Sequence, residues 1–196
     1  PLSITIDGKS YDEYEEINAT EFMELIDAGH NPTSSQPPIG KFLEVLEQYK
    51  DDEIIVISIA DGLSGAYQSW LSAKEMSEHS NVVIINSKTL AYPHRILVED
   101  AAVMRDEKAS VDDIVQMIHA RQSTMHSYLL PTDFDFLKRG GRLTPLAATM
   151  SGLLRIQPVV SQIPDGTRLE KFTVGRSFNI AVKKVMENLA SMGVDA

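Results

Sequence analysis

Short runs of β-branched residues alternate along the chain with segments of helical periodicity. The clearest run spans residues 54–59, and a loop of small residues separates it from apolar positions at helical spacing. A second run at residues 82–86 leads into a polar turn and another helical segment. Runs that are apolar on both faces are typical of parallel strands covered by helices on both sides. We therefore predict an α/β fold with a parallel sheet and right-handed crossovers.

The segments around these two runs complete the pattern. Alternation over residues 2–6 predicts a half-buried strand, and Asp7-Gly8 predicts a hairpin turn that leads into a polar edge arm. Asn18 with Glu21 predicts a capping box, and Gly29 predicts the end of that helix. The pattern changes after Arg121, so we predict a domain boundary near residue 122. Residues 1–122 would form an α/β/α domain, and residues 123–196 would begin a second α/β domain with a mixed sheet.

Composition and charge narrow the function classes. The 196 residues carry a net charge of −10 and include no cysteine, which excludes disulfides and thiolate catalysis and fits a cytoplasmic protein. Residues 1–137 hold 9 basic and 24 acidic side chains, whereas residues 138–196 hold 9 basic and 4 acidic side chains. A nucleic-acid partner is therefore disfavoured, although the last third suits an acidic or phosphate-bearing partner. We expect no membrane insertion, and the start at Pro1 indicates a fragment or a processed form.

Gly62-Leu63-Ser64-Gly65-Ala66 lies between a predicted strand and a predicted helix. It nearly matches the G-x-S-x-G nucleophile elbow, which makes a serine hydrolase built on Ser64 one hypothesis. The later histidines do not fall on a loop after a late strand, where a triad histidine is expected. Ser64 would instead lie at a helix N-terminus, where it could cap the helix or help to bind an anion.

Two other loops carry chemistry that suits an anion. Thr33, Ser34 and Ser35 precede two prolines at the start of a predicted helix, and capping needs only one of their hydroxyls, which favours a ligand. Residues 138–142 combine three basic side chains with two glycines, a pattern that suits a carboxylate or phosphate but also a helix C-terminus. The sequence shows no metal-ligand spacing and no phosphate-binding glycine motif, so we expect no metal and no cofactor.

Together these segments resemble the DegV family of bacterial fatty-acid-binding proteins. The resemblance rests on the order and spacing of TSSQP at residues 33–37, GLSGAYQS at 62–69, FLKRGGRLT at 136–144 and LLRIQPVV at 153–160. It implies a DegV-like fold in which an acyl chain is held between two α/β domains. It also implies that the first domain lacks its first strand here and that the second domain is truncated, without a tail histidine that helps to bind the carboxylate.

The resemblance implies a non-catalytic carrier that presents the carboxylate of a long-chain fatty acid to a separate fatty acid kinase. The alternatives are a serine hydrolase or a fold-related phosphotransferase. The chain departs from the family pattern at Trp70 and at residues 93–95, which could reshape the acyl pocket. The implied carboxylate-binding residues are Thr33, Ser34, Ser64, Gly65 and Arg142. Arg176 would lie on the kinase-docking side, and the positive charge of the last third leads us to add Arg139.

Overall fold

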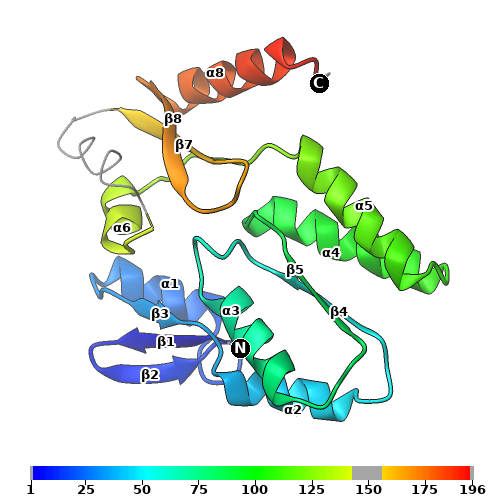
Figure 1. Cartoon of the computed structure of the whole chain (residues 1–196). Helices are drawn as coiled ribbons and strands as arrows, with labels where there is room; N and C mark the ends of the chain where they lie inside the picture. The colour runs from blue at the N-terminus through cyan, green and yellow to red at the C-terminus, as the bar shows by residue number, and fades with distance from the viewer. Residues whose placement is uncertain (1, 143–155, 195–196) are drawn as a thin grey trace. The chain divides into compact units, whose positions relative to one another are not determined.

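The computed structural model describes residues 2–142 and 156–194, and Figure 1 labels their helices and strands. The chain divides into two compact units, Pro1–Asn86 and Ser87–Ala196. The α/β fold class predicted from the sequence is confirmed. The predicted domain boundary near residue 122 differs from this division and stays a prediction.

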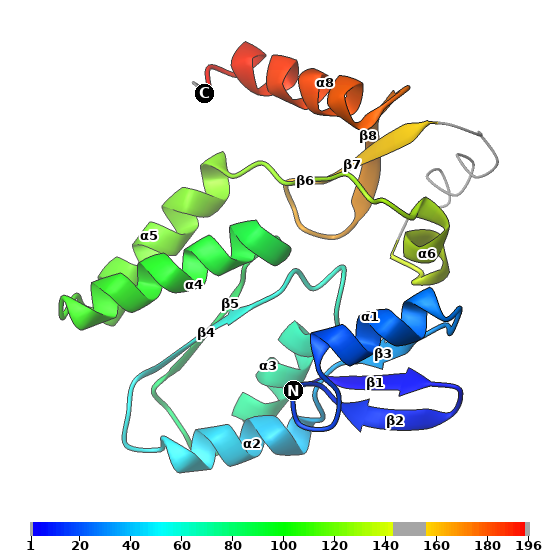
Figure 2. The ribbon, with the colours of Figure 1, turned by 180° about the vertical axis from the view of Figure 1, so that it is seen from behind.

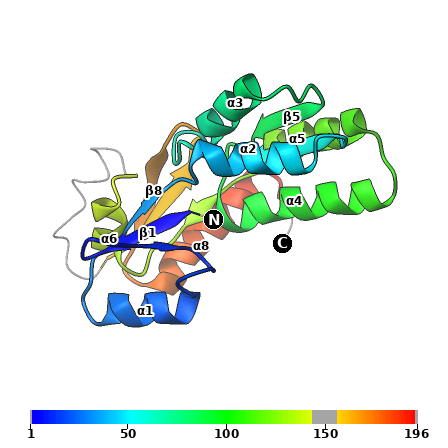
Figure 3. The same ribbon diagram turned by 90° about the horizontal axis from the view of Figure 1, so that it is seen from below.

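The first sheet of unit 1 has the strand order β2-β1-β3 and is covered by one helix (Figure 3). Its strands are β1 (Ser3–Ile6), β2 (Lys9–Asp12) and β3 (Thr33–Ser35), and the helix is α1 (Ala19–Asp27). Alternation in β1 buries Ile4 and Ile6 against apolar side chains of α1. The predicted capping box is confirmed, because Asn18 and Glu21 each accept a backbone N–H of the other.

The second half of unit 1 is a parallel strand pair packed against two helices (Figure 1). The elements are α2 (Ile39–Gln48), β4 (Ile54–Ser58), α3 (Ala66–Met76) and β5 (Val82–Asn86). Phe42 and Leu46 of α2 and Ala73 of α3 pack with Val56 and Val82 of the strands. The Lys74 ammonium also donates to the carbonyl of Val82 at 2.6 Å, which ties α3 to β5. The parallel strands predicted from the apolar runs are confirmed.

Unit 2 begins with a helical hairpin of α4 (Ala91–Asp106) and α5 (Val111–Thr124), seen side by side in Figure 2. Ser110 caps α5 by accepting the N–H of Asp113 at 3.1 Å. An ion pair of 2.8 Å between Arg121 and Asp100 joins the two helices. Pro93 lies in the first turn of α4, where a missing N–H is tolerated, so the helix continues through it.

The rest of unit 2 is an antiparallel sheet of order β6-β7-β8 with a helix packed on it. Val159 of β7 packs with Ala181 and Val185 of the last helix. Residues 153–155 of the motif LLRIQPVV lie outside the described residues. The elements are β6 (Tyr128–Leu129), α6 (Phe134–Arg139), β7 (Gln157–Gln162), β8 (Leu169–Gly175) and α8 (Phe178–Ser191).

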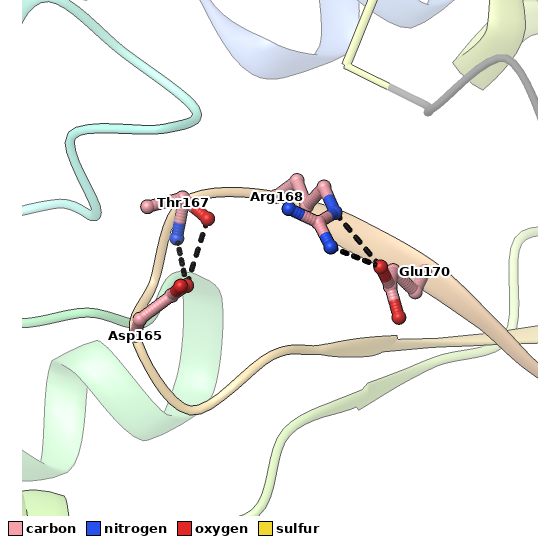
Figure 4. A network of polar contacts seen from close by, with 4 residues as sticks. All are labelled: Asp165, Thr167, Arg168 and Glu170. Carbon is pink, nitrogen blue, oxygen red and sulfur yellow. Dashed lines mark hydrogen bonds and ion pairs between the residues drawn. The ribbon is translucent and has the colours of Figure 1, made fainter.

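A polar network fixes the tip of the β7–β8 hairpin (Figure 4). One carboxylate oxygen of Asp165 accepts the N–H of Thr167 at 2.9 Å and its hydroxyl at 2.7 Å. These hydrogen bonds lower the pKa of Asp165 from its ordinary value, and the one from the Thr167 backbone has the larger effect. The neighbouring Gly166 lies directly against Lys88, because a Cβ at Gly166 would come within 2.8 Å of the Lys88 Cα. The hairpin tip therefore rests on the turn after β5.

Candidate functional site

The hydroxyl segment at residues 33–35 is a strand rather than the predicted loop. Its backbone pairs with β1, so that Thr33 lies opposite Thr5 and Ser34 lies opposite Ile4. All three side chains are exposed. Because successive side chains of a strand leave opposite faces, the hydroxyls of Thr33 and Ser34 point to opposite sides of β3. The sequence did not predict this geometry, which depends on pairing with a strand about 30 residues earlier.

Ser64 lies in the turn between β4 and α3, as predicted, and its side chain is half-buried. The N–H groups of Leu63 and Ser64 both donate to the carbonyl of Ala60, at 3.0 and 3.2 Å, which tightens the turn. The N-cap of α3 is Gly65, one residue after Ser64. The Ser64 Oγ nevertheless accepts the N–H of Ala66 at 3.2 Å. Ser64 thus serves the helix N-terminus from one position earlier than an ordinary N-cap.

Gln36 connects these two segments. Its side-chain amide donates to the hydroxyl of Ser69 in α3 at 2.5 Å. The same amide packs on Gly65, where a Cβ would come within 2.9 Å of the Gln36 Cδ and 3.0 Å of its Nε2. Gln36 and Ser69 were not among the predicted site residues, although they lie inside the motifs TSSQP and GLSGAYQS. Their place within the two motifs was the signal that could have identified them.

Two buried polar atoms flank the same turn. The Ser58 Oγ at the end of β4 and one carboxylate oxygen of Asp61 have no hydrogen-bond partner among the described residues. Ser58 is only 5% exposed. A buried polar atom without a partner costs free energy, so this end of β4 holds unused hydrogen-bonding capacity. Asp61 precedes Ser64 by three residues, so its unpaired carboxylate oxygen belongs to the same turn as Ser64.

The basic segment follows α6 and ends at the limit of the described residues. Arg142 is exposed, and its guanidinium donates to the carbonyl of Gly140. Arg139 is also exposed, with its guanidinium 5.6 Å from the centre of the Phe136 ring and 4.0 Å from Asp133. Gly141 has a φ of +75°, the left-handed conformation that glycine allows between the two arginines. Leu143 and Thr144 of the quoted motif lie outside the described residues.

Arg176 lies in the short connection between β8 and α8 and is exposed. The connection is tight, because a Cβ at Gly175 would come within 2.6 Å of the Ala181 nitrogen and 2.8 Å of the Ser177 carbonyl oxygen. Ser177 caps α8 by accepting the N–H of Ile180 at 3.4 Å. The glycine and the cap together hold the backbone on both sides of Arg176.

The structure brings together only part of the predicted set. Thr33, Ser34, Ser64 and Gly65 lie in two segments of unit 1 that the hydrogen bond from Gln36 to Ser69 connects, and we call these four residues the hydroxyl site. Arg139, Arg142 and Arg176 lie in unit 2. Within residues 2–142 and 156–194, no group of three or more His, Cys, Asp or Glu side chains is placed to hold a metal ion. No helix in those ranges is both long and apolar enough to cross a membrane.

Comparison with known proteins places these motifs in one family. The family model DegV, described as "Uncharacterised protein, DegV family", matches residues 1–195. A DegV domain-containing protein of Listeria monocytogenes is 37% identical over 164 residues, which cover 82% of this chain and 58% of that protein. The chain thus spans less than two thirds of that relative's length.

Solved structures agree with the family match. The crystal structure of a fatty acid binding DegV family protein from Streptococcus agalactiae has a TM-score of 0.84 and 26% identity. That match covers 100% of this chain and 70% of the other. DegV from Bacillus subtilis, described as a fatty acid binding protein, has a TM-score of 0.81 and 26% identity, with coverage of 97% and 68%. From the family match and this shared fold, we conclude that the chain belongs to the DegV family.

Proposed function

We propose that the protein is a non-catalytic carrier that binds a long-chain fatty acid and holds its carboxylate at the hydroxyl site, where either Thr33 or Ser34, which leave opposite faces of β3, acts together with Ser64. The observation that carries the proposal is the hydrogen bond from Gln36 to Ser69, which joins the segment of Thr33 and Ser34 to the turn of Ser64. The two solved relatives described as fatty acid binding proteins support the ligand class. The absence of cysteine fits a carrier that works in the cytoplasm.

The chemistry of the hydroxyl site suits a carboxylate. The Ser64 oxygen accepts the N–H of Ala66, so its own O–H is left to donate to a ligand. The N–H groups of Tyr67 and Gln68 have no described hydrogen bond, as expected in the first turn of a helix. These donors and the helix dipole favour a negative charge at the start of α3. A carboxylate that leaves water needs such donors to offset its desolvation.

The acyl tail would supply most of the affinity. Burial contributes about 0.8 kcal/mol per CH₂, so a tail of roughly fourteen methylenes offers on the order of 11 kcal/mol before the costs of binding. The head group then sets orientation more than affinity. We include Arg142 as a further ligand of the carboxylate, because a guanidinium can bind both of its oxygens.

Lipid analysis of the purified protein tests the carrier. Organic extraction followed by mass spectrometry should release a fatty acid, and stripped protein should take up added oleate or palmitate in equimolar amount. Protein that contains no lipid and takes up neither acid would contradict the proposal.

We also propose that the carrier presents the carboxylate to a separate fatty acid kinase, which docks at Arg176 with a contribution from Arg139. The exposed position of Arg176 and the net positive charge of residues 138–196 support an acidic or phosphate-bearing partner surface. Arg176→Ala should slow acyl-phosphate formation in a coupled assay and leave fatty acid affinity unchanged. Arg105→Ala removes an exposed guanidinium from α4 and serves as the control. Weaker lipid binding in Arg176→Ala, with a normal rate at saturating lipid, would contradict docking.

The alternative is an enzyme, either a hydrolase built on Ser64 or a phosphotransferase. The contacts of the two histidines in unit 1 favour the carrier. His30 contacts Asp7, and His79 contacts the carbonyl of Tyr49, so neither is paired with Ser64 as a general base would be. Labelling of Ser64 by an active-site probe would separate the hydrolase from the carrier.

A further inference from the structure

We propose that Gln36 is a positioning residue whose contact with α3 sets the carboxylate affinity of the hydroxyl site; this inference rests on the proposed function. Gln36 follows Ser34 by two residues, and Ser69 lies one helical turn after Gly65. The 2.5 Å hydrogen bond from the Gln36 amide to the Ser69 hydroxyl therefore joins the two hydroxyl-bearing segments close to both. Ser69 is only 5% exposed, so its side chain provides a fixed anchor.

Gly65 also packs against the Gln36 amide. The three heavy atoms nearest to a Cβ built at Gly65 all belong to the Gln36 amide group. Gly65 has φ −71° and ψ 1°, a backbone conformation that alanine adopts without strain. The atoms closest to a larger residue at position 65 thus all belong to the Gln36 amide. Gly65→Ala should displace that amide from Ser69 without removing any polar group and without straining the backbone.

The length and the charge of the side chain at position 36 both matter for this contact. Pro37 restricts Gln36 to an extended backbone, so the side chain alone spans the distance to Ser69. Asparagine is one methylene shorter and would not reach. Glutamate has the same length and could accept a hydrogen bond from the Ser69 hydroxyl. Its negative charge, however, would repel a bound carboxylate. A neutral side chain of this length joins the segments without opposing the ligand.

Hydrogen exchange of the ligand-free protein tests whether the contact holds the two segments together. Breaking it should raise amide exchange about tenfold in residues 33–36 and in residues 62–70. An increase confined to the mutated segment would overturn the joining role. The exposed Gln116 of α5 offers a matched glutamine control. The variants are Gln36→Ala, Ser69→Ala, Gly65→Ala and the control Gln116→Ala.

Affinity for oleate and for methyl oleate tests whether the contact serves the carboxylate. Gln36→Ala should weaken oleate binding about tenfold and methyl oleate binding by less than about twofold, because only the acid uses the positioned donors. Combining Gln36→Ala with Gly65→Ala should weaken oleate binding no further than either change alone, since both break one contact. Gln36→Glu should keep the slow exchange of the ligand-free protein and still weaken oleate binding.

The outcomes separate this inference from the proposed function. If Gln36→Ala lost equal affinity for oleate and for methyl oleate, the contact would only stabilise the fold in general. If Gln36→Ala bound oleate as tightly as Gln116→Ala does, Gln36 would have no role in binding. Either result overturns the inference while the carrier function stands. Wild-type protein that binds neither oleate nor palmitate overturns the proposed function, and the positioning role in carboxylate binding with it.

Discussion

Phe42 of α2 and Trp70 of α3 stack with their ring centroids 4.1 Å apart and their planes at 15°. Trp70 is the single tryptophan of the chain and lies beside Ser69, the anchor of the Gln36 contact. The stack packs against the core formed by Leu46, Ala73 and the β4–β5 pair. This packing gives Trp70 a role in joining α2 and α3 within unit 1.

Trp70→Ala should therefore lower the free energy of unfolding by about 2–4 kcal/mol, through the lost apolar burial and the lost ring stacking. Urea denaturation followed by circular dichroism measures the loss. Tyr92→Ala, which removes an aromatic ring that is 67% exposed on α4, should stay within about 0.5 kcal/mol of wild type. Similar losses in the two variants would contradict a core role for Trp70.

Ser64→Ala separates a ligand donor from a nucleophile. If the Ser64 hydroxyl donates to the carboxylate, its removal should weaken fatty acid binding by about 1–3 kcal/mol. Titration with oleate measures this, with Ser123→Ala on the exposed surface of α5 as the control. Wild-type protein should not react with a fluorophosphonate probe. Stoichiometric labelling of Ser64 would instead favour the hydrolase.

Two glycines with nearly the same φ separate the contact of the hairpin tip from the strain of a left-handed backbone. Gly8 has φ +80° and Gly166 has φ +82°, so alanine is strained at both by about 1–2 kcal/mol. A Cβ at Gly8 meets nothing within 4 Å, whereas at Gly166 it would come within 2.8 Å of the Lys88 Cα.

Gly166→Ala should consequently destabilise the protein by at least about 1 kcal/mol more than Gly8→Ala, because backbone atoms must move to make room. Urea denaturation of both variants gives the difference directly. Equal losses would show that the hairpin tip and the Lys88 turn do not rest on each other in solution.

The carboxylate of Asp165 makes the hairpin tip sensitive to acid. Hydrogen bonds from Thr167 lower the pKa of Asp165 below its ordinary 3.8. Since the pKa in the folded state is below that in the unfolded state, the stabilisation is complete above about pH 4 and is lost as the pH falls through the folded pKa.

Thr167→Val removes the hydroxyl donor and keeps the backbone N–H, so the pKa of Asp165 should rise part of the way toward 3.8. Titration of the Asp165 carboxyl by NMR measures the change. A midpoint that is the same in wild type and variant would rule out a role for the hydroxyl.

The sequence alone determined the features that depend on short-range patterns. The β-branched runs predicted β4 and β5, and the spacing of Asn18 and Glu21 predicted the cap of α1. Ser64 was placed correctly between a strand and a helix. Periodicity, capping and turn chemistry act over a few residues, so they can be recognised without the fold. The order and spacing of the motifs were likewise sufficient to identify the family.

Only the tertiary structure decided which distant segments meet. Residues 33–35 were predicted as a loop because prolines flank them on both sides, yet they pair with β1 because an open strand edge can take any extended backbone. The contact of Gln36 with Ser69 spans 33 residues, and its partners carry no local signal of each other. The approach of Gly166 to Lys88 likewise joins a turn and a hairpin far apart in the chain. Such contacts arise when packing brings elements together, and periodicity along one segment contains no information about its neighbour in space.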